Sequence, residues 1–111
     1  MPKKKNAKES KPVEEEETVN IVTPEIIIDH DDKMYYVNVE LPGVDKNHIE
    51  LSVGEQSLCV EAARDDVMYL GCFSLAHSVD ESKAKAKYDN GLLSIEIPLK
   101  GPLKGKIIKI E

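Results

Sequence analysis

The chain has 111 residues and a net charge of −6, with 41% hydrophobic and 32% charged residues, which is enough for one domain at most. A net acidic chain lacks the clustered Lys and Arg that phosphate backbones require, so no nucleic-acid partner is expected. No apolar run approaches the roughly 18 residues of a membrane span, so we expect no membrane partner and a cytoplasmic location.

The first eighteen residues differ from the rest. Residues 1–20 hold five Lys and five Glu, so the whole charge deficit falls on residues 21–111. Apart from Met1 and Val13, residues 1–18 have no large apolar side chain and no periodicity that could bury a face. They are predicted to form a disordered, charged N-terminal arm.

Four strands are predicted in the first half of the chain, the first from an apolar run before a turn and the other three from period-two alternation. The first covers residues 25–29, EIIID, whose three isoleucines indicate partial burial on both faces. The second strand stops at Pro42-Gly43, and a loop leads to the third. The apolar faces of the second, third and fourth strands are Tyr35, Val37, Val39 and Leu41; Ile49, Leu51 and Val53; and Leu58, Val60 and Ala62.

Three more strands are predicted in the second half. Residues 68–76 follow the tight Asp65-Asp66 connection, and a hairpin spans residues 84–99. Its turn is centred on Asn90-Gly91, because Asn-Gly supplies the positive φ angles of a tight primed turn. In the strand before the turn, alternate residues lie on opposite faces. One face carries Ala84, Ala86 and Tyr88, and the other carries Lys83, Lys85 and Lys87. After it, Leu93, Ile95 and Ile97 alternate with Ser94 and Glu96.

Seven or so short strands without a convincing helix are typical of an all-β sandwich. We expect the sandwich to cover residues 19–100, followed by a flexible C-terminal extension over residues 101–111 with a hinge at Gly101, Pro102 and Gly105. Cys59 and Cys72 lack C-x-x-C spacing and are interpreted as small buried hydrophobes. The alternative is a disulfide, which needs Cα atoms within about 7 Å.

The polar residues predict no catalytic, metal or cofactor site. His30, Asp31 and Asp32 lack ligand spacing, even with His48 and His77 recruited from elsewhere, and an Asp-rich turn explains them. The serines lack a G-x-S-x-G context, and no glycine-rich phosphate loop is present. The chain is therefore not expected to be an enzyme.

Several motifs in one order carry a resemblance. They are YYVNVELPGV at 35–44, IELSV at 49–53, LCVEA at 58–62, A-x-x-x-x-G-x-L at Ala86, Gly91 and Leu93, and I-x-I at Ile108 and Ile110. This set resembles the α-crystallin domain of the small heat-shock proteins, over roughly residues 24–99 and the C-terminal extension. The resemblance implies an immunoglobulin-like β-sandwich. It also implies an ATP-independent holdase that binds partly unfolded client proteins and self-associates.

The resemblance further implies a partner and client groove between two strands. One wall would be Ile49, Leu51 and Val53, the other would lie on the strand that carries Ala84 and Ala86, and Ile108 and Ile110 of a neighbouring subunit would plug it. Alternatively, the first wall is ordinary core and the tail packs on its own domain. If Lys83, Lys85 and Lys87 faced the groove instead of the alanines, their aliphatic stems would do the packing.

Three features depart from the family pattern. The connection at residues 65–67 is too short for the loop that many members exchange between subunits, Gly71 stands where many carry a basic residue, and the arm is charged rather than apolar. These departures favour a dimer or small oligomer over a large cage. The rival interpretation is a CS or p23-like co-chaperone or adaptor domain that docks on another protein. The short connection favours it, whereas the I-x-I tail and the hairpin motif do not.

Overall fold

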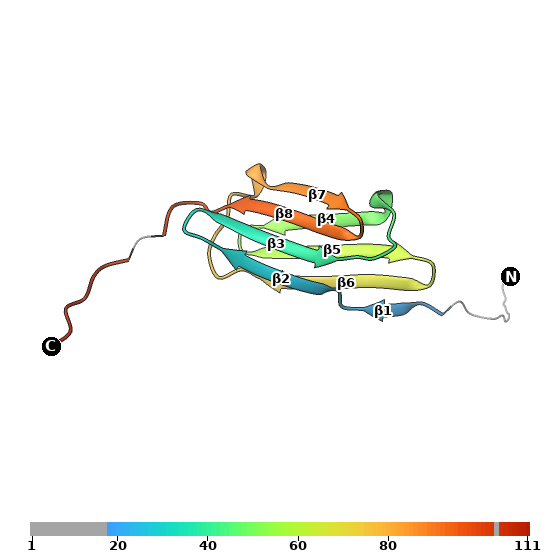
Figure 1. Ribbon diagram of the computed structural model, residues 1–111, viewed down its shortest axis with the longest axis horizontal. Coiled ribbons are helices and arrows are strands. Elements are labelled where there is room, and N and C mark those ends of the chain that lie inside the picture. Colours follow the sequence, from blue (N-terminus) through green and yellow to red (C-terminus); the bar gives the residue numbers. More distant parts are fainter. Residues whose placement is uncertain (1–17, 104) are drawn as a thin grey trace, which may run out of the picture.

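The computed structural model describes residues 18–103 and 105–111, which contain a sandwich of two four-stranded sheets (Figure 1). The predicted disordered arm lies outside the described residues, apart from Thr18. The strands are β1 (Asn20–Val22), β2 (Glu25–His30), β3 (Met34–Glu40), β4 (Ile49–Gly54), β5 (Ser57–Arg64), β6 (Val67–Ser74), β7 (Lys85–Asp89) and β8 (Leu92–Pro98). Two single-turn 3-10 helices, η2 (Lys46–His48) and η3 (Glu81–Lys83), precede β4 and β7.

One sheet has the order β1-β6-β5-β4 and the other β2-β3-β8-β7. Neighbouring strands pair antiparallel, except that β1 lies parallel to β6. The all-β sandwich and all seven expected strands are confirmed. β1 was not expected, because its three exposed residues carry no alternating pattern and it is held by backbone pairing to the edge of β6.

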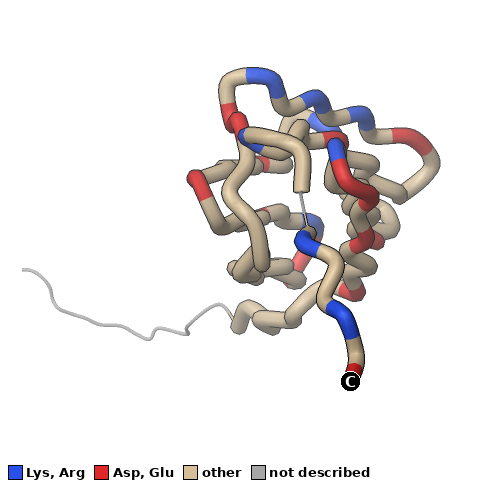
Figure 2. Tube along the Cα trace, turned by 90° about the vertical axis from the view of Figure 1, so that its left-hand side faces the viewer, with Lys and Arg blue, Asp and Glu red and all other residues tan. Residues whose placement is uncertain are grey.

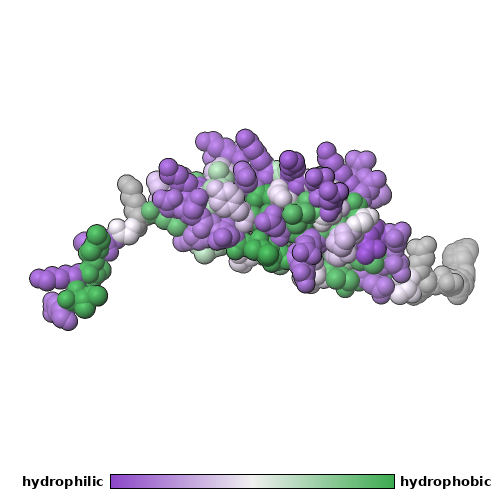
Figure 3. Space-filling model, viewed as in Figure 1, coloured by the Kyte–Doolittle hydropathy of each residue, from purple (hydrophilic) through white to green (hydrophobic). Residues whose placement is uncertain are grey.

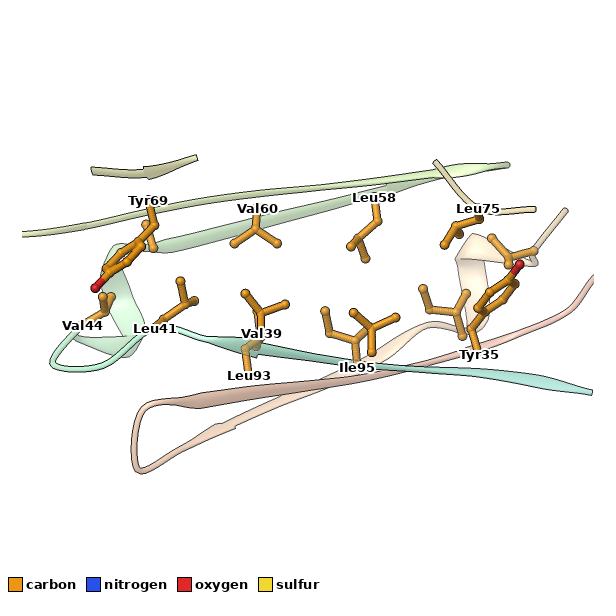
Figure 4. Packing of buried hydrophobic residues seen from close by; sticks show 14 of the residues in the cluster. Tyr35, Val39, Leu41, Val44, Leu58, Val60, Tyr69, Leu75, Leu93 and Ile95 are labelled. Atoms are coloured by element: carbon orange, nitrogen blue, oxygen red, sulfur yellow. The ribbon is translucent and has the colours of Figure 1, made fainter. Parts of the chain in front are cut away.

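The core fills the space between the sheets, where side chains from both layers point toward each other (Figure 4). The buried faces are those that alternation predicts: Tyr35, Val37 and Val39 on β3, Leu58, Val60 and Ala62 on β5, and Leu93, Ile95 and Ile97 on β8. Leu41 and Val44 of the loop after β3 are also buried, and the Leu41 N–H donates to the Gly91 carbonyl at 2.8 Å. The β3–β4 loop is thereby tied to the β7–β8 turn.

The β7–β8 turn has the predicted backbone. Asn90 and Gly91 adopt φ angles of 51° and 81°, as a primed two-residue turn requires. The β5–β6 connection is also as tight as expected, since only Asp65 and Asp66 separate the strands and Asp65 adopts a φ of 47°. This part of the chain has no loop that could be exchanged between subunits.

The expectation that the isoleucines of β2 are partly buried on both faces is wrong. Ile26 lies opposite the buried Val39 and packs against the core, whereas Ile28, opposite Val37, is 36% exposed and Ile27, opposite Asn38, is 67% exposed. β2 is the end strand of its sheet, and its outer face is not covered by another layer within the described residues.

The interpretation of the cysteines as buried hydrophobes is also wrong. Cys59 of β5 and Cys72 of β6 are directly opposite and form a disulfide, with their Cα atoms 4.1 Å apart. Cys59 alternates with the buried Leu58 and Val60, and Cys72 is its cross-strand partner, which places both on the outer face of the sheet. The two-residue turn determines this register, because counting back equally along both strands from Arg64 and Val67 reaches the two cysteines.

Gly71 has a local packing role. A Cβ at this position would lie 2.7 Å from Cζ of Phe73 and 3.4 Å from Cδ of Pro24. The Phe73 ring therefore occupies the space that a larger residue at position 71 would need.

No helix in the described part of the chain is long and apolar enough to cross a membrane.

Candidate partner-binding seam

The sandwich has one long edge at which β4 and β7 lie next to each other, each as the last strand of its sheet (Figure 1). β4 pairs with β5 and β7 pairs with β8, so each strand has one side without a partner strand in the described structure. We call the inward-facing apolar residues of this edge the β4–β7 seam: Ile49, Leu51, Val53, Ala84, Ala86 and Tyr88.

On the β4 side, the register points three apolar residues toward the core. Ile49, Leu51 and Val53 lie opposite Ala62, Val60 and Leu58, all of which are buried. Yet Ile49, Leu51 and Val53 are only half-buried, because no further strand covers them at the edge. Their side chains therefore point toward the core, but part of each side chain remains accessible to solvent.

On the β7 side, the register identifies which face the alanines take. Ala86 lies opposite the buried Ile95 and Tyr88 opposite the buried Leu93, so both are on the inward face. Ala86 is nevertheless exposed. Lys85 and Lys87 lie opposite Glu96 and Ser94 on the outer face, and Figure 2 shows the basic positions alternating with uncharged ones along this uppermost strand. The apolar positions, not the lysines, line the seam.

Hydrogen bonds fix one end of the seam. The Tyr88 hydroxyl lies 2.7 Å from the Leu41 carbonyl oxygen and 2.8 Å from that of Val44, so it holds the end of β7 against the β3–β4 loop. The loop itself is shaped by Asp45, whose carboxylate accepts the Asn47 N–H at 3.0 Å at the start of η2. The positions of β4 and β7 are thus set by contacts outside the two strands.

The other end is fixed by the turn between β4 and β5. The Glu55 carbonyl accepts the Val79 N–H at 2.8 Å, and the Glu55 carboxylate pairs with the Lys100 ammonium group just after β8. The hydrogen bond and positive charge of Lys100 hold the pKa of Glu55 below its ordinary value, and Glu55 raises the pKa of Lys100. Both side chains are well exposed, so this pair contributes little to stability.

The residues expected to plug the seam stand in solvent. Residues 105–111 have no regular secondary structure, and the side chains of Ile107, Ile108 and Ile110 are 97%, 71% and 92% exposed. Figure 3 shows the C-terminal segment, with its apolar surface, extending away from the domain. The seam and the I-x-I residues of one chain are therefore not in contact, and the tail is not packed on its own domain.

The histidines do not form a metal-binding group. His30 and His77 lie near each other, with ring centroids 4.9 Å apart, and the backbone N–H of His77 donates to the Tyr35 hydroxyl at 3.0 Å. The described residues contain no group of three or more His, Cys, Asp or Glu placed to hold a metal ion. What the arrangement offers chemically is an apolar seam flanked by strand edges.

Comparisons with known proteins agree with this architecture. The model of the Hsp20/alpha crystallin family matches residues 27–111. The small heat shock protein C4 of Rickettsia felis is 32% identical over 106 residues, which cover 81% of this chain and 65% of that protein. A probable 15 kDa heat shock protein of Leptospira interrogans is 28% identical over 82% of this chain and 81% of its own length.

Solved structures share the fold. Heat shock protein 16.0 from Schizosaccharomyces pombe superposes with a TM-score of 0.67 at 20% identity, over 81% of this chain and 99% of that one. The Del-C4 mutant of hsp14.1 from Sulfolobus superposes with a TM-score of 0.66 at 25% identity, over 78% and 81% of the two chains. The immunoglobulin-like sandwich predicted from the motif order is thus confirmed.

Proposed function

The chain belongs to the Hsp20/alpha crystallin family, and we propose that it is an ATP-independent holdase that binds partly unfolded proteins and keeps them from aggregating. Family membership supports a chaperone role in general. The observation that carries the finer proposal is the β4–β7 seam, where inward-facing apolar side chains remain accessible beside two strand edges that no other described strand pairs with. We propose that binding alone accounts for the activity, without a catalytic step or a cofactor.

The proposal rests on what a partly unfolded protein exposes. Such a chain presents apolar side chains and unpaired backbone groups, which together drive aggregation. An extended segment lying along the seam would cover Leu51 and Ala86 with its own apolar residues. It could also pair its backbone with the free side of β4 or β7, as in other cases of β-strand addition.

We further propose that a second copy of this chain competes for the same seam through its tail. In an extended segment, residues two apart point to the same side, so Ile108 and Ile110 present one apolar face while Ile107 and Lys109 point away. Both isoleucines are exposed and available in the single chain. The proposed assemblies are dimers or small oligomers. A cytoplasmic location stays a prediction.

The holdase proposal is tested by light scattering of a heat-denaturing model client. We expect the chain to suppress scattering in the absence of nucleotide, with no further effect of added ATP. An unrelated protein at the same mass concentration serves as the control. Absence of suppression at a severalfold excess over client would sink the proposal.

One observation favours a second candidate. The two-residue β5–β6 turn leaves no exchangeable loop, which suits a monomeric CS or p23-like adaptor that docks on another protein. An adaptor would remain monomeric and would not suppress client scattering. Measuring native mass in the same samples therefore separates the two candidates.

A further inference from the structure

The sequence suggests that Cys59 and Cys72 are buried, but both lie on the outer face of their sheet. Cys59 and Cys72 form a directly opposed pair on neighbouring antiparallel strands, 4.1 Å apart at Cα and bonded through sulfur. Leu58 and Val60, on either side of Cys59, are buried in the core. The cysteines therefore point outward, and their oxidation state can change without opening the core.

The pair is accessible to reagents. Cys72 is exposed and Cys59 is half-buried. Both line a surface depression of about 240 Å³, together with Glu50, Ser52, Val60, Glu61 and Leu70. A small thiol or disulfide can reach the sulfur atoms in this depression, whereas a disulfide sealed between the sheets would be protected from exchange.

We propose that Cys59 and Cys72 form a reversible thiol–disulfide site that exchanges with low-molecular-weight disulfides and thiols. In the oxidising direction, the more exposed Cys72 thiolate attacks one sulfur of a disulfide RSSR, forming a Cys72–SR mixed disulfide and releasing one RS⁻. The Cys59 thiolate then attacks Cys72 Sγ, forming the Cys59–Cys72 bond and releasing the second RS⁻. The two cysteines lose two electrons, RSSR gains them, and the two cysteine protons end on the two RSH products.

The surrounding charge selects the reagent. Glu50 and Glu61 lie directly opposite each other on the outer face and both line the depression, where no Lys or Arg is present among the lining residues. An anionic disulfide such as oxidised glutathione is repelled by this pair, and a cationic disulfide such as cystamine is attracted. The preferred partner is therefore a neutral or cationic disulfide, and the preference weakens as salt screens the carboxylates.

The bond also cross-links a hairpin. Cys59 and Cys72 are 13 residues apart and bracket the Asp65-Asp66 turn, so oxidation holds β5 and β6 in register. Closing a loop of this length restricts the unfolded chain and stabilises the folded one. Because β6 pairs on its other side with the three-residue β1 alone among the described strands, the hairpin is the main element that keeps β6 in its sheet.

The test begins with fully reduced full-length chain, freed of reductant and exposed separately to cystamine and to oxidised glutathione. Mass spectrometry and thiol titration follow the reaction. We expect loss of both thiols, an intramolecular Cys59–Cys72 bond, and severalfold faster oxidation by cystamine. The rate difference should shrink in high salt and in the E50Q/E61Q variant. Equal rates for the two reagents at low salt would overturn the charge selectivity.

Two sets of cysteine variants complete the test. C59S and C72S should each stop at a mixed disulfide, and C59S/C72S should not respond to either reagent. Oxidised wild-type chain should melt about 10 °C above reduced chain, while C59S/C72S melts at the same temperature with and without reductant. Wild-type chain that accumulates mixed disulfides or intermolecular dimers, or that melts equally in both states, would overturn the proposal.

Discussion

At the residue scale, the chain is tightly constrained at a turn position where the backbone conformation and the close packing both favour glycine. Gly91 combines a φ of 81° with close packing, since a Cβ there would lie 3.2 Å from the Pro42 Cα atom. Its carbonyl accepts the Leu41 N–H, so the same residue joins the β7–β8 turn to the buried loop after β3. Backbone strain introduced at Gly91 would therefore distort both the β7–β8 hairpin and the end of the β4–β7 seam.

We predict that Gly91→Ala lowers the free energy of unfolding by about 1–3 kcal/mol, because alanine is strained at this φ and its Cβ presses on backbone. Thermal denaturation should show a fall in Tm of roughly 5 °C or more. Gly101→Ala is the matched control, since its added Cβ would meet no described atom within 4 Å beyond its own chain neighbours and its φ is not in the left-handed region. A fall of equal size in both variants would contradict this account of Gly91.

The sequence predicts this turn because Asn-Gly between two alternating strands strongly favours the positive φ angles of a primed two-residue turn. It does not favour the disulfide, since no C-x-x-C spacing marks Cys59 and Cys72 and both have apolar neighbours, Leu58 and Val60 for the first and Gly71 and Phe73 for the second. The informative signal was the two-residue Asp65-Asp66 turn, from which the opposing positions on β5 and β6 can be counted. In the sequence, Gly71 is noticed because it stands where many members of the family carry a basic residue. The structure adds that the Phe73 ring occupies the space beside it.

At the element scale, alternation predicts the two faces of each strand but not which face is inside. For β7 the two faces carry alanines or lysines, and the pairing of Ala86 with Ile95 makes the alanine face the inner one. Sequence could not decide this, because lysine stems can cover apolar surface as well. β1 was missed for a different reason, since its stabilisation comes from backbone pairing that leaves no side-chain pattern.

The turns between elements are held by carboxylates. The Asp31 side chain accepts the N–H groups of Lys33 and Met34, each at 2.8 Å, and thereby shapes the β2–β3 turn. These backbone hydrogen bonds hold the pKa of Asp31 below its ordinary value. The pKa of Asp80 is lowered in the same direction, first by the Ser82 hydroxyl at the start of η3.

A lowered pKa in the folded state gives a defined pH dependence. The stabilisation is fully present above the ordinary carboxyl pKa of about 4 and is lost as the pH falls through the lowered folded value. We predict that Tm falls between pH 5 and about pH 2 and that Asp31→Asn shows a smaller fall, because its amide keeps an acceptor oxygen without titrating. A variant as acid-sensitive as the wild type would mean that Asp31 does not contribute.

At the scale of the whole molecule, we propose that the tail of one chain covers the β4–β7 seam of another. The order of motifs predicts the sandwich, which the structure confirms, and a C-terminal extension with an I-x-I docking motif, which stays a prediction. That the tail plugs a seam on a second copy stays a proposal, because the single chain leaves Ile108 and Ile110 in solvent. Assembly depends on a second surface, which no pattern in one sequence specifies directly.

We predict that Ile108→Gly/Ile110→Gly lowers the native mass measured by light scattering after size exclusion. Two buried isoleucines contribute on the order of 3–6 kcal/mol to docking, so their loss should dissociate the assembly. Tm of the domain should stay nearly unchanged. Ile107→Gly/Lys109→Gly, on the opposite side of the tail, should keep the wild-type mass. An unchanged mass in the first variant would reject docking by the tail.

The seam itself can be tested with one matched pair of variants. Ala86→Asp places a charge on the exposed inner face of β7, and Ser94→Asp adds the same charge on the outer face of the adjacent strand, opposite Lys87. Both variants should fold, because Ala86 is exposed and because the carboxylate introduced at position 94 would lie opposite the positively charged Lys87.

The most direct measurement is therefore suppression of client aggregation by wild type, Ala86→Asp and Ser94→Asp at equal concentration, followed by light scattering without nucleotide. The account predicts that Ala86→Asp loses most of the suppression because clients must desolvate a charge in the seam, whereas Ser94→Asp keeps it. Equal suppression by both folded variants would contradict the claim that the β4–β7 seam binds clients.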